Sequence, residues 1–272
     1  GASAEGTIHG AWSAPSFQNG VHEDPEWLLE HMEDFGTAAS ECHYNVGWAW
    51  AQDSPFQWMK QVASHFGGTR NGMAISWPKR IKDQGGLRSQ FHHVIDIAPT
   101  ILEAIGIEAP EEVDGVSQMP IEGTSMGYTF DSPQTESTHK TQYFEILGNR
   151  GIYHDGFMAS CFHGRVPWVR MASVPFDGPQ EKWELYDIRT DFSQSNDLSE
   201  ELPEKLTELQ NLFDEEAKRN NVYPLRDPGS RLTENTRPPD PLNGVKKAFY
   251  TTDHVRMPEF SVLNIKNHSF QI

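Results

Sequence analysis

Lys60 is the residue of this chain whose type and setting best suit the binding of an anion. It lies in the run Gly47 to Pro78, shortly before the glycine pair Gly67-Gly68. A lysine ammonium is a compact point charge, and on a packed element it can neutralise an anion whose charge moves onto a leaving oxygen. The alternative interpretation is a solvated surface lysine beside an ordinary helix end.

Cysteine and histidine residues form no recognisable metal or redox motif. Cys42 and Cys161 lie far apart in the sequence, so neither a disulfide framework nor a zinc site is indicated. The early histidines have no adjacent carboxylate or cysteine pattern, which favours structural or solvent-exposed roles over metal ligation. These histidines are His22, His31, His43 and His65. The last of them is the best placed, since it follows Lys60 by about one turn of a predicted helix.

The elements around Lys60 are predicted to be a helix, a turn and a strand. Ser54 can act as an N-cap, and Pro55 suits the first helical position. Apolar residues then recur at the three-and-four spacing of one helix face, at Phe56, Met59, Val62, Ala63 and Phe66. Gly67-Gly68 would end this helix, and residues 73–77 are typical of a short strand that ends at Pro78. The pattern predicts a helix, turn and strand unit of an α/β sheet.

Residues 58–70, with the strand up to Pro78, resemble the late part of the catalytic domain of bacterial arylsulfatases. In that family a lysine shortly before the Gly-Gly turn binds the sulfate oxygens of the substrate, so the resemblance implies a catalytic role for Lys60. The run His93 to Gly106 matches the same pattern, and it also occurs in phosphonate and phosphodiester hydrolases of the alkaline-phosphatase superfamily. The implied fold class is α/β: the late part of an alkaline-phosphatase-like sulfatase catalytic domain, followed by a small α+β subdomain with an antiparallel sheet and one packed helix.

The nucleophile implied by this resemblance is not found in the sequence. Sulfatases attack with a formylglycine made from a Cys or Ser in a Cys-x-Pro-x-Arg motif. Cys161 and Arg165 have the matching separation, but His163 stands where the proline belongs. This segment also follows Lys60, whereas the family places its nucleophile well before that lysine. We therefore interpret the match as chance.

Calcium is the cofactor that the resemblance implies. In the family, an Asp-Asn pair that ligates calcium directly precedes a glycine of the type found in Gly1 to Gly6, so the principal ligands are expected upstream of Gly1. The chain begins without Met and ends within a strand-like pattern, so we expect a fragment that lacks the amino-terminal half of the catalytic domain. By itself the chain is expected neither to hydrolyse an aryl sulfate nor to bind calcium tightly.

Three regions are predicted along the chain. Residues 1–135 would be the carboxyl-terminal part of the catalytic domain, residues 136–225 a small subdomain, and residues 226–272 a linker and the start of an incomplete β segment. In the first region we expect helices that begin at Asp24-Pro25 and that end at Gly106. In the second we expect strands at 142–147, 151–162 and 183–187, a hairpin turn at 148–150, and an amphipathic helix over 200–220.

Composition excludes several classes of protein. The chain has 272 residues and 36% hydrophobic content, which is enough for one large domain or two smaller ones. Its net charge of −17 argues against a nucleic-acid surface and against attraction to anionic membranes. A site for an anion must therefore use local cations, backbone donors or a metal. No apolar run has the length of a membrane span, and a soluble protein of the bacterial cytoplasm or periplasm is expected.

The leading expectation from the resemblance is part of an arylsulfatase that hydrolyses a small-molecule sulfate ester by a formylglycine and calcium mechanism. One alternative is a phosphonate or phosphodiester hydrolase of the same superfamily, which a preference for phosphodiester over aryl sulfate would identify. Another is a non-catalytic binding or accessory protein, which a reading frame without an upstream catalytic half would favour.

Overall fold

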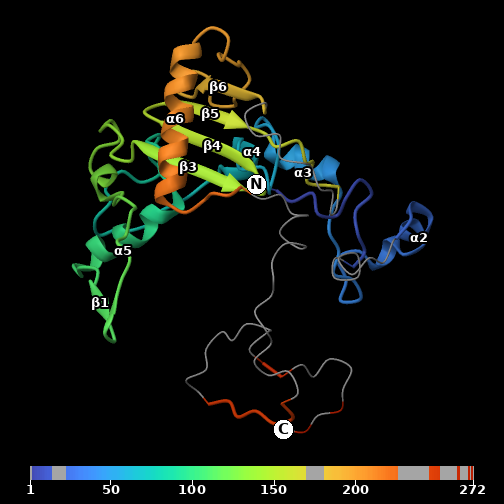
Figure 1. Cartoon of the computed structure of the whole chain (residues 1–272). Coiled ribbons are helices and arrows are strands. Elements are labelled where there is room, and N and C mark those ends of the chain that lie inside the picture. The colour runs from blue at the N-terminus through green and yellow to red at the C-terminus, as the bar shows by residue number, and fades with distance from the viewer. Residues whose placement is uncertain are drawn as a thin grey trace. The chain divides into compact units, whose positions relative to one another are not determined.

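The computed structural model describes residues 2–13, 23–169, 181–225, 245–251, 262–263, 269 and 271 (Figure 1). The chain divides into two compact units, Gly1–Pro228 and Gly229–Ile272, and all the elements named below lie in the first. Most of residues 226–272, the predicted linker and β segment, lies outside the described residues, and the described part of this stretch forms no helix or strand. None of the described helices has the length and apolar character needed to cross a bilayer.

A four-stranded antiparallel sheet forms the centre of the first unit. Its strands are β3 (Thr141–Ile146), β4 (Asn149–His154), β5 (Phe157–Cys161) and β6 (Trp183–Asp187), in the order β3-β4-β5-β6. Cross-strand pairing aligns Tyr143 with Ile152, Ile152 with Ala159, and Ala159 with Leu185. Side chains of residues paired in this way point to one face of a sheet. One row of apolar residues therefore crosses all four strands.

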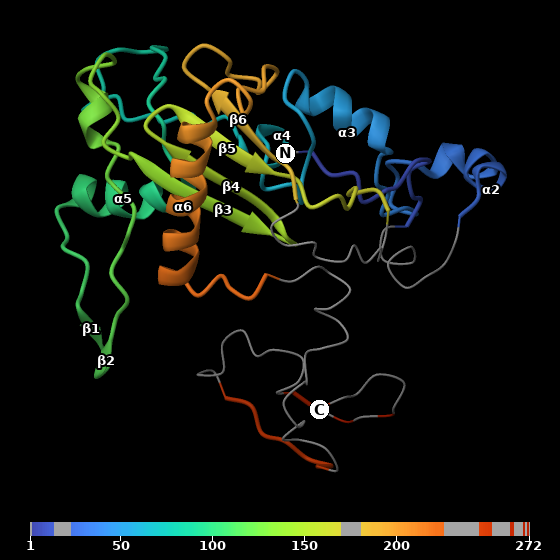
Figure 2. The same cartoon turned by 45° about the horizontal axis from the view of Figure 1, so that its top comes forward.

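Helix α6 (Pro203–Arg219) packs on that face of the sheet. Leu209, Phe213 and Ala217 are fully buried at a spacing of four, and they contact the row of apolar residues on the strands. Figure 2 shows the helix crossing the strands. The predicted antiparallel sheet with one packed helix is confirmed. The helix begins slightly later than predicted, at Pro203, which suits a first helical position.

The opposite face of the sheet is covered by segments from earlier in the chain. Buried Tyr153 and Met158 point there, and they pack with Phe66 of the short helix α4 (Phe66–Thr69). Partly buried residues complete this cluster: Phe56, Phe91, Phe144 and Ile188. The sheet therefore lies between α6 and a segment that includes α4, as Figures 1 and 2 both show.

Two tight turns connect the first three strands. Leu147 and Gly148 have φ angles of 56° and 85°, and Asp155 and Gly156 have φ angles of 44° and 91°. Positive φ at both central residues is the signature of a type I′ hairpin turn. The first turn lies slightly before the predicted position at 148–150. The predicted strand over 151–162 is two strands, because the Asp-Gly turn divides it.

Helices and a small hairpin precede the sheet. Asp24 caps α2 (Pro25–Glu30), as predicted, and η1 (Met32–Asp34) and α3 (Val46–Asp53) follow. Next come η2 (Val94–Asp96) and α5 (Ile97–Ile105), which ends at Gly106 with a φ angle of 69°, as predicted. The hairpin of β1 (Glu112–Val113) and β2 (Val116–Ser117) is followed by η3 (Gly127–Phe130).

The helix and strand predicted around Lys60 are wrong. Ser54 ends α3, which is capped by Asn45 and begins at Val46, and no helix forms until Phe66. The apolar residues of the predicted helix face are still buried or half-buried, so the spacing correctly indicated burial but not helical backbone. Residues 73–77 form no strand, and Met73 and Ile75 are exposed.

Candidate active site

Lys60 lies on a compact loop, residues 57–67, which we call the Lys60 loop. A backbone hydrogen bond from Gly67 N to Gln57 O, at 3.0 Å, joins its two ends. Met59 and Val62 are fully buried inside it, whereas half of the Lys60 side chain is exposed. A loop whose ends meet and whose own side chains fill it resembles an Ω-loop. The loop holds the lysine backbone in place without a helix.

The glycine pair allows the chain to pack closely against this loop. A Cβ atom on Gly67 would lie 2.0 Å from the carbonyl oxygen of Trp58, and one on Gly68 would lie 2.0 Å from that of Val62. Contacts this short with backbone atoms are not tolerated without movement of the chain. The pair lies within α4, so close packing explains these glycines better than the predicted helix end.

Two residues next to Lys60 have strained backbone. Trp58 has a φ angle of 64° and Gln61 has one of 82°, and neither residue is glycine. Left-handed backbone at such residues costs free energy and persists where surrounding contacts determine it. The two residues bracket Met59 and Lys60, so the shape of the chain at the lysine depends on its packing.

Lys60 lies among polar groups from three parts of the chain. Its Nζ is 2.8 Å from Glu5 Oε1, which also accepts a hydrogen bond from Gln61 Nε2 at 2.8 Å. Arg165 Nη1 donates to Gln61 Oε1 at 2.8 Å, and Lys60 N donates to Ala2 O at 2.9 Å. Burial raises the pKa of Glu5, but the hydrogen bonds and the charge of Lys60 outweigh it and leave the pKa below its usual value.

This arrangement can hold an anion. Two cations, Lys60 and Arg165, accompany one carboxylate in a chain that is strongly acidic elsewhere. An ammonium group has three donors, so Lys60 can keep its contact with Glu5 and still donate to a further oxygen. The site therefore has the local cations that the global charge does not provide.

Aromatic rings gather around Trp58, two residues before the lysine. Trp58 stacks on Phe162 with ring centroids 4.1 Å apart, and Trp168 and Trp50 each lie 6.3 Å from the Trp58 ring. Trp50 is about half exposed. Phe56 instead belongs to the core against the sheet. Trp50 is therefore accessible near Trp58, whereas Phe56 packs against the sheet.

The early histidines that lie within the described residues make structural contacts. His65 is buried, with Nδ1 2.9 Å from Ser64 Oγ and Nε2 3.1 Å from Glu184 Oε2. His31 stacks on Trp27, and His43 bonds the carbonyl of Tyr44. His22 lies outside the described residues. Within the described part of the chain, no three His, Cys, Asp or Glu side chains are grouped so that they could hold a metal ion.

Cys161 is not placed to act as a nucleophile. It is buried with Arg150 Nη2 2.9 Å from its sulfur, and Glu181 forms ion pairs with Arg150 and His163. Burial raises the pKa of the Cys161 thiol to about 11, so the thiol stays protonated at neutral pH. Arg165, from the same five-residue match, instead reaches Gln61 of the Lys60 loop.

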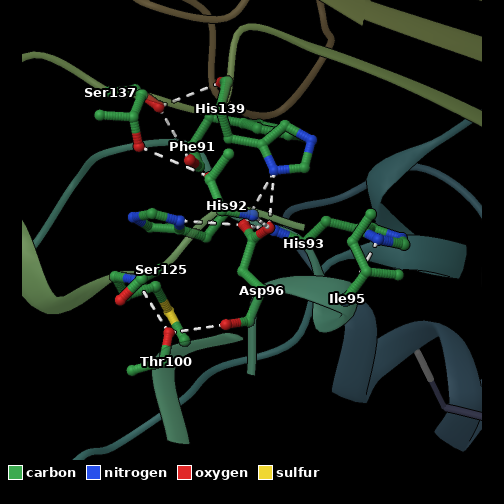
Figure 3. A network of polar contacts seen from close by, with 12 residues as sticks. Phe91, His92, His93, Ile95, Asp96, Thr100, Ser125, Ser137 and His139 are labelled. Carbon is green, nitrogen blue, oxygen red and sulfur yellow. Dashed lines mark hydrogen bonds and ion pairs between the residues drawn. The ribbon is translucent and has the colours of Figure 1, made fainter. Parts of the chain in front are cut away.

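A second polar network surrounds the buried carboxylate of Asp96 (Figure 3). His139 Nδ1 lies 2.9 Å from both carboxylate oxygens, His92 Nδ1 lies 3.0 Å from Oδ2, and the amides of His93 and Thr124 donate to the carboxylate. His139 Nε2 faces the carbonyl of Thr141 at 3.1 Å. The His139 ring therefore lies between the Asp96 carboxylate and the start of β3, with a polar partner at each nitrogen.

Sequence reasoning identified neither this network nor the contact between Arg165 and the Lys60 loop. The only local signal at Asp96 is the spacing to His93, which forms a capping box with it. Because Asp96 and His139 are buried, the network has a structural role and is not an accessible catalytic group. It joins η2 to the start of β3.

A family model matches the part of the chain that contains the Lys60 loop, the sheet and α6. It is described as N-sulphoglucosamine sulphohydrolase, C-terminal, and it matches residues 56–222.

Two curated relatives carry the name sulfatase. An N-acetylglucosamine-6-O-sulfatase of Bacteroides thetaiotaomicron is 25% identical over 169 residues, which are 60% of this chain and 27% of that protein. An uncharacterized sulfatase of Schizosaccharomyces pombe is 27% identical over 181 residues, which are 65% of this chain and 30% of that protein. The matched part of the chain thus spans less than a third of either relative.

Solved structures give weaker similarities. The structure of BT4656 in complex with its substrate D-glucosamine-2-N,6-O-disulfate is 22% identical, with a TM-score of 0.38 over 55% of this chain and 28% of that chain. The structure of Ps i-CgsB in complex with k-i-k-neocarrahexaose is 18% identical, with a TM-score of 0.47 over 78% of this chain and 44% of that chain. Both TM-scores are low, so these similarities carry no conclusion about the site.

Proposed function

Because the chain belongs to the N-sulphoglucosamine sulphohydrolase C-terminal family, we propose that it forms part of an enzyme that hydrolyses sulfate esters and that Lys60 binds the sulfate group. The family match over residues 56–222 carries this proposal, because it includes the Lys60 loop. The half-exposed ammonium of Lys60 and the neighbouring Arg165 support it, since they supply positive charge in an acidic chain.

Lys60 acts on the charge of the sulfate group in this proposal. During hydrolysis of a sulfate ester, negative charge builds on the oxygen that leaves. An ammonium fixed next to the sulfuryl oxygens stabilises that charge better than mobile water does, because it needs no reorganisation. The packed loop around Met59 and Val62 provides the fixed position, and Glu5 helps to orient the ammonium.

The formylglycine nucleophile and the calcium ion of the proposed mechanism would come from other parts of the enzyme. Cys161 is buried as a thiol, and the described residues offer no cluster of metal ligands. By itself the 272-residue chain should neither turn over a chromogenic aryl sulfate nor bind calcium tightly. Turnover above that of a heat-inactivated sample, or tight binding in a calcium titration, would contradict this.

The substrate of the enzyme that carries this chain could be an aryl sulfate or a sulfated amino sugar, and a phosphodiester is the alternative to both. The motifs around Lys60 resemble arylsulfatases, which favours an aryl sulfate. One relative is named as an N-acetylglucosamine-6-O-sulfatase, which favours a sulfated amino sugar. Rings of both kinds can stack on aromatic side chains such as the half-exposed Trp50. Turnover of 4-nitrophenyl sulfate, of N-acetylglucosamine-6-sulfate and of a phosphodiester by the enzyme that carries this chain separates these classes. A preference for the phosphodiester would overturn the assignment to sulfate esters.

Replacement of Lys60 tests its role. Lys60→Ala should lower turnover on the order of a hundredfold, as loss of one fixed donor at developing charge does. Lys60→Arg should not restore full activity, because the planar guanidinium of arginine places its charge differently from the compact ammonium of lysine. The thermal melt should change little, since the ion pair with Glu5 is partly exposed. Lys82→Ala is the matched control, because Lys82 is exposed and donates only to the carbonyl of Lys79 nearby. Near-normal turnover in Lys60→Ala would remove Lys60 from the site.

A further inference from the structure

Two buried amide side chains attach the Lys60 loop to the antiparallel sheet. One is Asn149, the first residue of β4, and the other is Gln194, which follows β6. Their exposed fractions are 2% and 0%, respectively. A buried amide is costly unless its polar atoms are paired, and a paired one fixes the groups that it bonds. The bonds of these two residues therefore identify what each of them holds in place.

Asn149 holds the loop next to the lysine. Its Nδ2 donates to the carbonyl of Gln61 at 3.0 Å and to that of Ile146 at 3.3 Å, and its Oδ1 accepts from the amide of His163 at 3.0 Å. Gln61 directly follows Lys60 and has the strained φ angle of 82°. The amide of Asn149 therefore joins the strained part of the loop to two strands of the sheet.

Gln194 holds the two ends of the loop. Its Oε1 accepts from the amide of Phe66 at 2.7 Å, and its backbone carbonyl accepts from the side chain of Gln57. Its Nε2 donates to Ser160 Oγ, near the end of β5, at 3.0 Å. Gln57 begins the Lys60 loop and Phe66 lies at its other end. Both ends are thus fixed by one residue that is itself bonded to the sheet.

A neighbouring contact strengthens the same attachment. Ser160 pairs across the sheet with Glu184, and Glu184 holds His65 of the loop. The hydrogen bond with His65 lowers the pKa of Glu184 and outweighs burial, which raises it. Two paired positions of the sheet therefore hold the end of the loop: Glu184 bonds His65 directly, and Ser160 is linked to Phe66 through Gln194.

We propose that Asn149 and Gln194 are positioning residues that set the location of the Lys60 ammonium. The proposal rests on the role of Lys60 given above. In this proposal the antiparallel sheet does more than pack against a catalytic domain. It also contributes to catalysis, because it positions the lysine. A shift of about 1 Å in a group that binds the reacting centre can cost on the order of a hundredfold in rate. Loss of either amide should therefore act through the lysine.

The test compares substitutions with and without Lys60, in the enzyme that carries this chain. Asn149→Ala removes the donor to Gln61, and Gln194→Met removes the acceptor for Phe66 at similar side-chain volume. Each should lower kcat/KM for the sulfate ester about tenfold or more. In the Lys60→Ala background, each should have almost no further effect, because the group that it positions is absent.

A control separates positioning from stability. Ile152→Val removes one methylene from the other face of the sheet, where α6 packs, and it touches no residue of the loop. It should lower the melting temperature and leave kcat/KM unchanged well below the melt. If Gln194→Met does not fold, Gln57→Leu removes the side-chain bonds of Gln57 to the Gln194 carbonyl and to Tyr186, and it should show the same dependence on Lys60.

The outcomes distinguish this inference from the proposal on which it rests. Near-normal turnover in Lys60→Ala would remove the role of the lysine and the positioning with it. An impaired Lys60→Ala enzyme together with near-normal Asn149→Ala and Gln194→Met enzymes would overturn the positioning alone. Equal losses with and without Lys60 would also overturn it, because the amides would then act on something other than the lysine.

Discussion

One added methyl group at Gly67 or Gly68 would prevent the close packing of the chain at the Lys60 loop. Gly67 and Gly68 lie against the carbonyls of the loop so closely that a Cβ atom on either would meet backbone oxygen at 2.0 Å. Backbone cannot move aside as a flexible side chain can. The loop and α4 are therefore one packed unit, and the glycines allow the compact loop whose Gln61 carbonyl accepts from Asn149.

The glycine pair gives a prediction about stability. Gly67→Ala should lower the free energy of unfolding by about 1–3 kcal/mol, the range for overpacking a well-packed site. Gly72→Ala is the control, because a Cβ atom there would meet nothing within 4 Å, and it should change the free energy by less than about 0.5 kcal/mol. Urea unfolding of the chain measures both. Equal effects of the two substitutions would show that close packing at Gly67 is unimportant.

At the scale of elements, the network around Asp96 ties η2 to β3. Burial raises the pKa of Asp96, but bonds from the amides of His93 and Thr124 and from the two histidine rings outweigh it, so the pKa lies below its usual value. Burial and the positive charge of His139 lower the pKa of His93. The carboxylate therefore gathers several donors from segments far apart in the sequence.

This network predicts how stability depends on pH. Because the folded state lowers the pKa of Asp96, the carboxylate stabilises the fold above its unfolded value of about 4, and this stabilisation is lost as pH falls through the lower folded value. Asp96→Asn should make the free energy of unfolding less sensitive to acid. At neutral pH it should cost about 1–3 kcal/mol, because the buried ring of His139 loses its hydrogen bond to a charged acceptor. Urea unfolding between about pH 3 and pH 7, a range that contains the ordinary pKa of an aspartate, measures this, and parallel curves for the two proteins would contradict it.

Some elements could be predicted from the sequence and others could not. Helix α6 was predictable because an apolar stripe, a charged opposite face and a proline at the start all agree. The Lys60 loop has apolar residues at helical spacing, but close approach of Gly67 and positive φ angles at Trp58 and Gln61 override that spacing. The bonds of Gln194 to Phe66 and of His139 to Asp96 join residues far apart in the chain, and local patterns hold no information about such pairs.

For the whole molecule, the predicted fold class is confirmed. The family match covers residues 56–222, and the structure has the predicted antiparallel sheet with one packed helix. The predicted division at residue 135 stays a prediction. The sheet has different partners on its two faces: α6 covers one, and the Lys60 loop and α4 contact the other. The sheet thus links its own stability to the position of the candidate site.

Helix α5 has an exposed apolar face, which is unusual for a chain with a net charge of −17. The helix buries polar Thr100, whereas Ile101 and Ile105 are 54% and 59% exposed. Thr100 is held inside because its hydroxyl donates to the carbonyl of Asp96 and accepts from the amide of Met126. The hydrogen bonds of Thr100 therefore keep the polar side of the helix inside and leave its isoleucines exposed. The apolar surface that results favours association.

The last prediction concerns this surface. A variant with both Ile101→Lys and Ile105→Lys should bind less of a fluorescent apolar dye and remain monomeric at higher concentration, because the exposed patch is gone. Its free energy of unfolding should stay within about 0.5 kcal/mol of wild type, since both side chains are exposed and lysine suits a helix at least as well as isoleucine. Leu87→Lys is the control, because Leu87 is 91% exposed outside the helix. Unchanged dye binding, or a large loss of stability in the double variant, would mean that this face of α5 is covered in solution.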